Sequence, residues 1–286
     1  MTTAIITGTS TGIGQATTVA LARAGHTVFA AMRNPKGGHE LEEIVSKEKL
    51  PVKIVAMDVD DDASVTRAVG QVLVESGHID VLANNAGVGG GGAVEEVPLA
   101  MFREIMETNF FGALRCIQAV LPSMRQRTQG CIVNVSSVAG RFAAAPQAPY
   151  SASKWALEAL SECLAQEVKA FNIRVAIIEP GIIATPIFGK AKPVVAESRY
   201  PHTRRLRALF AEAIKNPVSP YVVADQIRDI VESGSWQLRY PVGPDAARGI
   251  LARAALSDED WVSRGALSDT EWVAMIKRER GLDVTL

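Results

Sequence analysis

The sequence predicts an α/β fold, a doubly wound parallel sheet of about seven strands with helices on both faces. Two features predict this fold. Short apolar runs, typical of strands buried on both faces, alternate along the chain with longer segments of helical periodicity. A glycine-rich turn also joins the first apolar run to the first helical segment.

The first elements form one unit. Residues 4–6 are predicted to be a strand, residues 8–14 a glycine turn, residues 16–24 a helix and residues 27–32 a second strand. A strand, a turn, a helix and a strand within about thirty residues form a βαβ unit. We therefore expect parallel strands joined by a right-handed crossover.

The alternation continues along the chain. Further strands are predicted at residues 52–57, 79–84, 130–136, 173–179 and 238–242. Helices are predicted at residues 38–49, 61–76, 99–127, 151–171 and 221–233. In such sheets, ligands bind beyond the carboxyl ends of the strands. One shared site is therefore expected to contain the residues at those ends, Gly8, Asp58, Asn85, Ser137 and Gly181.

Length and composition limit the possible functions. The chain has 286 residues, of which 48% are hydrophobic, so one domain covering residues 1–286 is expected. A net charge of −1 gives no basic surface for nucleic acid or membranes. The 3 cysteines lack metal-site spacing, and no apolar run approaches the ~20 residues that cross a bilayer. We expect a cytoplasmic protein with no metal, nucleic-acid or membrane partner.

The glycine turn is typical of a nucleotide-binding loop. Gly8 permits the tight turn, Gly12 allows a pyrophosphate to approach the backbone, and Gly14 allows the helix to pack closely on the strand. Phosphates then lie at the helix N-terminus, beside Ser10, Thr11 and Ile13. The alternative is an ordinary glycine-rich turn, but the flanking strands and helix favour nucleotide binding.

Tyr150 and Lys154 are candidates for acid–base chemistry. Four residues apart on a helix, they share one face. A phenol titrates near ~10, and a neighbouring cation favours the phenolate, so the pair is expected to act as a general acid and base. Ser137 would hold the oxygen of a carbonyl or alcohol. A chance pair on a surface helix is the alternative, which the glycine loop argues against.

Together these motifs resemble a known family. Thr7-Gly8-x-x-x-Gly12-x-Gly14, Asn84-Asn85-Ala86-Gly87, Ser137, Tyr150-x-x-x-Lys154 and Pro180-Gly181 follow the order and spacing of the short-chain dehydrogenases/reductases in their compact single-domain form. The resemblance covers residues 3–242. It implies a Rossmann-type fold that transfers a hydride between a nicotinamide cofactor and a carbonyl compound or secondary alcohol, with Tyr150 as the general acid/base.

The resemblance also implies roles for single residues. Asn109 is identified as the fourth catalytic residue, which bends its helix and holds a water that extends the proton path from Lys154. The alternative role of Asn109 is that of a buried structural amide. Lys154 would also bind the nicotinamide ribose. Ser136 is a rival for Ser137, but only Ser137 has the family's spacing of thirteen residues to Tyr150.

Cofactor contacts follow from the same resemblance. Asp58 would bind the adenine amino group, although it could instead cap the next helix, a role that suits Asp60 or Asp61 better. Asn85, Ala86 and Gly87 would pass under the adenosine ribose, and Asn84 would tie strands together. The loop that begins at Pro180 and Gly181 would hold the nicotinamide carboxamide through the Ile183 backbone and the Thr185 hydroxyl.

The end of the second strand indicates which cofactor binds. Met32 stands where an acidic residue would select NAD, and Arg33 follows it. A guanidinium can bind the 2′-phosphate of NADP through a planar fork. NADP(H) is therefore favoured over NAD(H). The alternative is a solvated arginine, and the glycine loop lacks the basic residue that many NADP-binding relatives carry.

Two regions are expected to shape the substrate site. Residues 184–217 are predicted to form a lid that contains a helix capped by Thr203. Its basic residues, Arg204 and Arg205 among them, form either a solvated face or an approach for an anion. Residues 245–286 are predicted to be a helical extension, with caps at Ser257 and Ser268.

The helix at residues 151–171 is apolar on two sides. One side is expected to cover the sheet. The other side meets a second subunit, as the resemblance implies for a homodimer or homotetramer, or it is buried by the C-terminal tail.

The leading hypothesis is an NADP(H)-dependent carbonyl reductase or alcohol dehydrogenase that acts on a small molecule. An NAD-dependent alcohol dehydrogenase of the same fold is one alternative. A catalytically silent, NADP-sensing regulator is another, but a sensor does not need an intact set of Ser137, Tyr150 and Lys154.

Overall fold

The computed structural model describes residues 2–187 and 197–286. Its strands are β1 (Thr3–Thr7), β2 (Thr27–Met32), β3 (Val52–Ala56), β4 (Val81–Asn84), β5 (Gly130–Val135), β6 (Ile173–Pro180) and β7 (Arg239–Val242). They form one seven-stranded parallel sheet in the order β3-β2-β1-β4-β5-β6-β7. The predicted fold class is confirmed. The strand order reverses between β1 and β4, where a ligand crevice is expected.

The helices alternate with the strands as predicted. They are α1 (Gly12–Arg23), α2 (His39–Glu48), α3 (Asp62–Ser76), α4 (Leu99–Met106), α5 (Gly112–Arg127), α6 (Ala148–Glu167), α8 (His202–Ala213), α9 (Tyr221–Ser233), α10 (Ala246–Ala254), α11 (Asp258–Ser263) and α12 (Asp269–Arg280). Short 3-10 turns lie at η1 (Pro35–Gly37), η3 (Val138–Gly140), η4 (Lys169–Phe171) and η5 (Arg264–Ala266).

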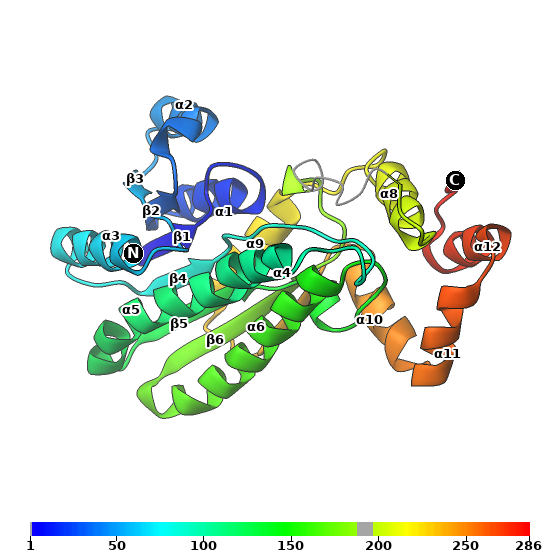
Figure 1. Ribbon diagram of the computed structural model, residues 1–286. Helices are drawn as coiled ribbons and strands as arrows, with labels where there is room; N and C mark the ends of the chain where they lie inside the picture. The colour runs from blue at the N-terminus through cyan, green and yellow to red at the C-terminus, as the bar shows by residue number, and fades with distance from the viewer. Residues whose placement is uncertain (1, 188–196) are drawn as a thin grey trace.

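Alternate side chains of each strand enter opposite helical layers. Ile5 of β1 packs with α3, α5 and α6 on one face of the sheet. Ile6 packs with α1 and α9 on the other face (Figure 1). Both isoleucines are fully buried, and each contributes about 1.5–3 kcal/mol by burial. This double coverage explains why the strands are continuous apolar runs.

The predicted helix at residues 99–127 is interrupted in its middle. A π-helical turn, η2 (Glu107–Phe111), joins α4 to α5. At its centre the Asn109 side chain is bonded to the main chain of Val88, which lies on the loop after β4. Single-turn π-bulges of this kind are frequent at functional sites.

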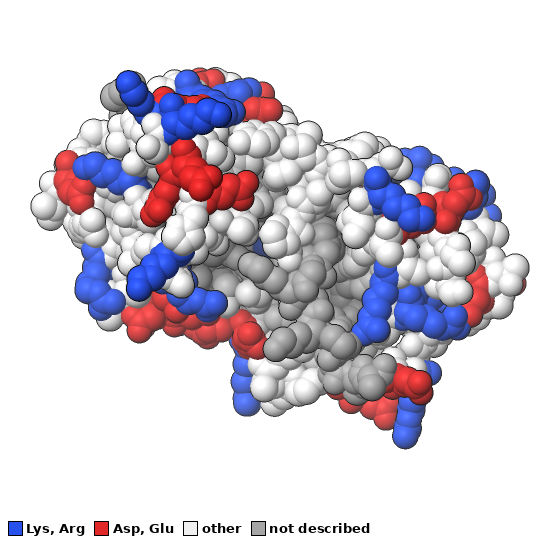
Figure 2. Space-filling model, turned by 90° about the horizontal axis from the view of Figure 1, so that it is seen from above, with Lys and Arg blue, Asp and Glu red and all other residues white. Residues whose placement is uncertain are grey.

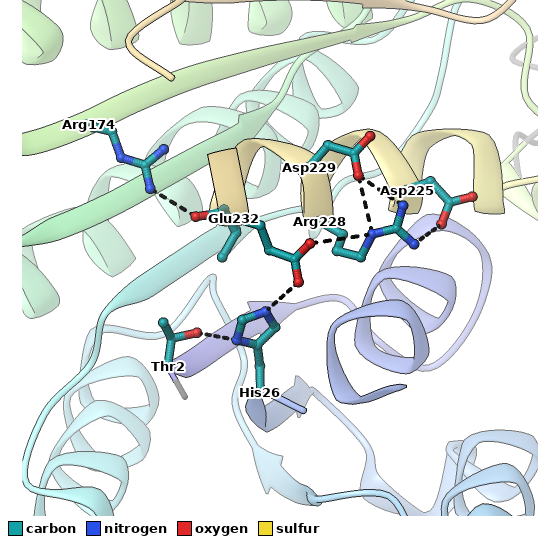
Figure 3. Close-up of polar contacts among 8 residues, drawn as sticks. Thr2, His26, Arg174, Asp225, Arg228, Asp229 and Glu232 are labelled. Atoms are coloured by element: carbon teal, nitrogen blue, oxygen red, sulfur yellow. Dashed lines mark hydrogen bonds and ion pairs between the residues drawn. The ribbon is translucent and has the colours of Figure 1, made fainter. Parts of the chain in front are cut away.

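A polar cluster ties α9 to the amino ends of the strands (Figure 3). The His26 ring contacts the Thr2 hydroxyl at 2.7 Å and the Glu232 carboxylate at 3.3 Å. Arg174 of β6 donates to the Ile230 and Val231 carbonyls at the end of α9. These groups lie at the edge of the sheet opposite the predicted site, and Arg174 satisfies two carbonyls at the end of α9.

Helix α8 of the predicted lid packs against the C-terminal extension. Leu209 of α8 forms a buried cluster with Met275 and Ile276 of α12. Figure 1 shows α8, α11 and α12 together, beyond the end of the sheet. Within the predicted lid of residues 184–217, residues 188–196 lie outside the described part.

Two expectations about the lid are wrong. Helix α8 begins at His202 after Pro201, and the Thr203 side chain makes no cap bond. Arg204 and Arg205 do not form a free anion site, because both bind Asp269 of α12. The Arg204 side chain is 56% exposed, as expected for a solvated face, whereas Arg205 is only 3% exposed. Local sequence gave no sign of Asp269, which lies more than sixty residues further along the chain.

The caps predicted in the extension are confirmed. Ser257 accepts from the Asp260 N–H at the start of α11, and Ser268 forms a capping box with Glu271 at the start of α12.

The extension does not cover the outer side of α6. Trp155 is 49% exposed, and Ala152, Ala159 and Cys163 are exposed on the same side. The expectation that the tail buries this side is therefore wrong. Across residues 2–187 and 197–286, no helix is long and apolar enough to cross a bilayer.

Candidate active site

The glycine loop after β1 is clamped to the loop after β4. The Thr7 hydroxyl accepts from the Asn85 and Ala86 N–H groups, both at 3.0 Å. The Asn85 side-chain amide donates to the Thr7 and Gly8 carbonyls at 3.0 and 3.1 Å. These bonds hold together two loops that the sequence predicted would meet. Thr7 and Asn85 therefore have a structural role, which the sequence did not predict.

Two glycines of the loop are required by close contacts. Gly8 has a φ of +70°, and a Cβ there would lie 2.7 Å from the Ala86 Cα. A Cβ on Gly14 would lie 2.3 Å from the Gly8 carbonyl oxygen. The predicted packing role of Gly14 is confirmed. Gly12 has a φ of +63° and faces Thr185, which a Cβ would approach to 3.2 Å.

The N-terminus of α1 opens onto the same region. Its N-cap residue, Thr11, makes no side-chain cap bond, and no acidic residue lies in the first turn. First-turn N–H groups therefore remain for a ligand, and the positive end of the helix dipole favours an anion. Thr9, which the sequence analysis did not single out, donates through its N–H and hydroxyl to the Ala31 carbonyl. This bond holds the loop against β2.

Arg33 follows β2 as an exposed side chain on the wall of the same cleft. Among the described residues it forms no ion pair. Asp60 lies on the same wall, and its carboxylate accepts from the Thr108 hydroxyl at 3.0 Å. Burial raises the pKa of Asp60, and Arg33 acts weakly in the opposite direction. The cap of α3 is neither Asp58 nor Asp60. It is Asp61, whose side chain accepts from the Ser64 N–H.

Tyr150 and Lys154 share one face of α6, as predicted. The Lys154 Nζ donates to the Val135 carbonyl at 2.9 Å and lies 5.7 Å from the centre of the Tyr150 ring. Burial lowers the pKa of Lys154 to about 8, and Glu158 opposes this shift. Burial also raises the pKa of Tyr150, against a hydrogen bond from Ser137 that lowers it.

The expected acidification of Tyr150 is therefore wrong. The ammonium is held over the ring by the Val135 carbonyl, and dehydration of the phenol dominates its pKa. A neutral phenol at neutral pH remains suited to giving a proton to a developing alkoxide.

Ser137 is placed by the turn that follows β5. It is the N-cap residue of η3, and its hydroxyl oxygen accepts from the Ala139 N–H at 3.1 Å. The hydrogen bond to Tyr150 joins it to the predicted acid. Its rival Ser136 is 3% exposed and lies closer to the core.

Asn109 is a buried residue that supports the helix backbone at Tyr150. It is 1% exposed. Its amide donates to the Ser153 hydroxyl at 3.0 Å, and that hydroxyl donates to the Tyr150 carbonyl at 2.7 Å. Asn109 thus links the π-helical turn to the backbone of α6.

Asn84 ties two strands together, as predicted. Its side-chain amide on β4 donates to the Asn134 side chain on β5.

A cluster of buried charges lies beneath Lys154. Glu158 binds Arg239 of β7 at 3.0 Å, and Glu179 of β6 binds Arg141 at 2.8 Å. Burial is the main cause that raises the pKa of Glu158, and the nearby Glu179 raises it further. The sequence motifs did not indicate this cluster. The spacing of Lys154 and Glu158, four residues apart on a helix, was the available signal.

The loop after β6 is fixed by Asp245, which the sequence analysis also missed. Both carboxylate oxygens of Asp245 accept from the Ile182 N–H, at 3.0 and 3.3 Å. A Cβ on Gly181 would lie 2.0 Å from one of these oxygens. Gly181 is therefore needed for this contact as well as for the turn.

These elements surround one cleft of about 1460 Å³. Its wall includes every predicted cofactor and catalytic residue except Gly14 and Asn109, which lie behind it. The predicted residues on the wall are Gly8, Ser10, Thr11, Gly12, Ile13, Arg33, Asp58, Asn85, Ala86, Gly87, Ser137, Tyr150, Lys154, Pro180, Gly181, Ile183 and Thr185. Figure 2 shows the lobe of α8 and α12 on the right, set apart from the larger part of the molecule on the left.

Comparison with known proteins agrees with this architecture. A family model described as short chain dehydrogenase matches residues 2–195. The chain belongs to the short-chain dehydrogenase family.

Several members of this family are similar over large parts of the chain. The 3-ketodihydrosphingosine reductase of Bacteroides thetaiotaomicron is 43% identical over 180 residues, which cover 62% of this chain and 62% of that protein, less than two thirds of its length. The crystal structure of a short-chain dehydrogenase from Streptomyces avermitilis is 35% identical, with a TM-score of 0.77 and coverage of 93% of this chain and 99% of that one. The structure of an actinorhodin polyketide ketoreductase variant with NADPH is 26% identical, with a TM-score of 0.72, and covers 83% of this chain and 95% of that one.

In the part of this short-chain dehydrogenase that the structure describes, no three His, Cys, Asp or Glu side chains are grouped to hold an ion.

Proposed function

We propose that this protein is an NADP(H)-dependent oxidoreductase that interconverts a carbonyl compound and a secondary alcohol, with Tyr150 as the general acid/base. The observation that carries the proposal is the meeting of Ser137, Tyr150 and Lys154 with the glycine loop in one cleft. The relatives named above support it, because two of them are reductases by name.

The residues of the cleft fit a dinucleotide. Gly8 and Gly14 leave no room for a Cβ, so the loop packs closely on its neighbours, and Gly12 on the cleft wall leaves the backbone bare where a pyrophosphate would lie. The first turn of α1 would offer N–H groups to its phosphates, and Asp58 on the cleft wall would bind the adenine amino group. Asn85, Ala86 and Gly87 would lie along the adenosine ribose. Ile183 and Thr185 would hold the carboxamide.

The chemistry of the chain's own residues follows from their positions. When bound, the nicotinamide supplies a hydride to the carbonyl carbon or takes one from the carbinol carbon. Ser137 and Tyr150 donate hydrogen bonds to the carbonyl oxygen, where negative charge develops. Tyr150 then gives its proton to that oxygen. The Lys154 ammonium stabilises the phenolate that remains, and it also binds the nicotinamide ribose.

Asn109 would complete the proton path. Its buried amide fixes the π-helical turn and, through Ser153, the Tyr150 carbonyl. We propose that this frame holds a water that extends the proton path from Lys154, so that a proton from solvent returns to the Tyr150 phenolate.

NADP(H) is proposed over NAD(H) because of the residues that follow β2. Met32 is buried at the strand end, and no carboxylate occupies that position. Arg33 lies on the cleft wall, forms no ion pair with any residue that the structure describes, and suits a 2′-phosphate. The related ketoreductase whose structure contains NADPH supports this choice.

A screen of ketones and secondary alcohols with both cofactors, followed by the absorbance of the reduced nicotinamide, tests the proposal. We expect turnover with NADP(H), and the Tyr150→Phe protein should bind NADPH while losing turnover. Tight NADPH binding without turnover of any carbonyl or alcohol would instead favour a silent NADP-sensing regulator.

A further inference from the structure

The loop after Ser137 joins the predicted reaction centre to the C-terminal helices. Phe142 ends this loop, and its ring lies 3.5 Å from where a Cβ on Gly249 of α10 would be. Trp261 of α11 meets the same ring edge-to-face, with centroids 5.9 Å apart, and donates to the Ala143 carbonyl at 2.9 Å. An apolar wall therefore runs from Ser137 to α10.

Two arginines stand at the far end of this wall. Arg248 precedes Gly249 on α10, and its guanidinium donates to the Arg278 carbonyl of α12 at 3.5 Å. Arg280 is the last residue of α12, two positions further on. Both side chains lie on the cleft wall. The two helices thus bring two guanidinium groups to one corner of the cleft.

The part of the cleft wall that comes from residues 197–286 has more arginines than its ion pairs with carboxylates neutralise. Six arginines from the segment 197–286 lie on the cleft wall, and three of them already bind carboxylates: Arg205 with Asp269, Arg253 with Asp258, and Arg264 with Glu279. Among the described residues, Arg207, Arg248 and Arg280 form no ion pair. Asp245 is nearby and its negative charge attracts Arg280. Its oxygens accept from the Ile182 N–H, however, and among the described residues it forms no ion pair with Arg248 or Arg280.

Arg248 and Arg280 are both exposed to solvent in the cleft, so an incoming anion can reach them. Two like charges side by side repel each other, and an anion that binds both relieves this repulsion. Guanidinium groups bind carboxylate and phosphate through paired hydrogen bonds, so these two anions suit the corner.

We propose that Arg248 and Arg280 bind a carboxylate or phosphate group of the substrate, which is a carbonyl compound with an apolar segment between its carbonyl and its anionic end. The carbonyl lies at Ser137 and Tyr150, the apolar segment lies along Phe142 and Trp261, and the anionic group lies at the corner. This inference rests on the proposed reductase function for the position of the carbonyl only.

The test compares methyl-ketone carboxylic acids of increasing chain length, from levulinate upward, each with its methyl ester and with the matching keto phosphate. We expect one chain length at which the acid or the phosphate exceeds the ester in kcat/KM by about tenfold or more. Arg248→Gln and Arg280→Gln should each remove this preference and leave kcat/KM for the ester unchanged. The matched control is Arg278→Gln, because the Arg278 side chain is 72% exposed and is not on the cleft wall.

Calorimetric binding of the same acids to the NADPH-loaded protein separates the two proposals. Arg280-dependent binding of the acid without turnover of any ketone would leave the anion site standing and reject the reductase function. Turnover of esters at the rate of acids, with equal losses in Arg280→Gln for both, would reject the anion site and leave the reductase function standing. Unchanged ester turnover in each variant also shows that it is folded.

Discussion

Glu158 lies one helical turn beyond Lys154 on α6, and its carboxylate opposes the fall in the Lys154 pKa that burial causes. Burial brings the pKa of Lys154 to about 8, so the charge of this ammonium changes close to neutral pH. The Tyr150 phenol titrates later, because burial raises its pKa. The two groups of the predicted pair are therefore separated in pH by their surroundings.

The first prediction concerns the pH dependence of ketone reduction. Reduction needs the Tyr150 proton and the Lys154 cation. The ammonium loses its proton first as pH rises, so we expect kcat for ketone reduction to fall through a pH of about 8, its pKa in this structure. A pH profile of kcat at saturating NADPH measures this. A profile that stayed flat to pH values well above the Lys154 pKa would contradict the assignment.

Glu158→Gln tests the source of this pKa. Loss of the carboxylate removes the interaction that raises the pKa of Lys154, so the alkaline limb of the profile should move to lower pH. Glu162→Gln is the matched control, because Glu162 also binds Arg239 but its side chain is 54% exposed. An equal shift in both variants would mean that the loss of an ion pair with Arg239, and not the loss of the Glu158 charge beside Lys154, moves the alkaline limb.

Arg33→Glu tests the proposed cofactor preference. A carboxylate at the end of β2 would repel a 2′-phosphate and accept hydrogen bonds from a free ribose. The Kd for NADPH should rise by about tenfold or more, and the Kd for NADH should change little or fall. Fluorescence titration with both cofactors measures this. Arg67→Glu makes the same charge change on the exposed side of α3 and should affect neither; similar losses for NADPH and NADH in Arg33→Glu would reject the phosphate contact.

Gly181→Ala should damage the loop after β6. The added Cβ would meet an oxygen of Asp245 at 2.0 Å, so the loop or the carboxylate must move. We expect a loss of about 1–3 kcal/mol in the free energy of unfolding, together with weaker cofactor binding. Urea unfolding and NADPH titration measure both. Gly181→Ala combined with Asp245→Ala should recover part of the stability, and a double variant no better than the single one would refute the clash.

The sequence predicted the sheet and the cleft because their signals are local. Gly8 and Gly14 lie in one loop, and Tyr150 and Lys154 lie in one helical turn. The strands were found from short apolar runs, which double burial requires. Each of these features is decided by residues within a few positions of one another, so no knowledge of the tertiary fold was needed.

The features that the sequence did not predict depend on distant partners. Asp245 reaches Ile182 across 63 positions, and Arg205 reaches Asp269 across 64. The pKa of Tyr150 was misjudged for a related reason. Spacing placed a cation beside the phenol, but it could not show that the Val135 carbonyl holds Lys154 or that burial dominates.

Arg205→Met tests how α8 is held to the C-terminal extension. Its buried guanidinium binds Asp269 and the Leu267 carbonyl, and methionine would leave that carbonyl without this donor. We expect a loss of about 1–3 kcal/mol in local stability, seen as faster amide exchange in α12 than in β1. Arg204→Met is the control, because its side chain is 56% exposed and exposed ion pairs contribute little. Equal exchange in the two variants would show that burial of Arg205 is unimportant.

Trp155→Glu tests the proposed homo-oligomer. Trp155, with Ala152 and Ala159, leaves an apolar outer side on α6, and Phe111 is likewise 42% exposed at the start of α5. Large apolar side chains exposed together mark a contact surface, and a buried carboxylate would oppose it. Light scattering after size-exclusion chromatography should give an oligomer for the unchanged protein and a monomer for Trp155→Glu. Val262→Glu, on a residue of α11 that is 74% exposed, should leave the oligomer intact. A monomeric unchanged protein would refute the oligomer, and a Trp155→Glu protein of unchanged mass would place the interface elsewhere.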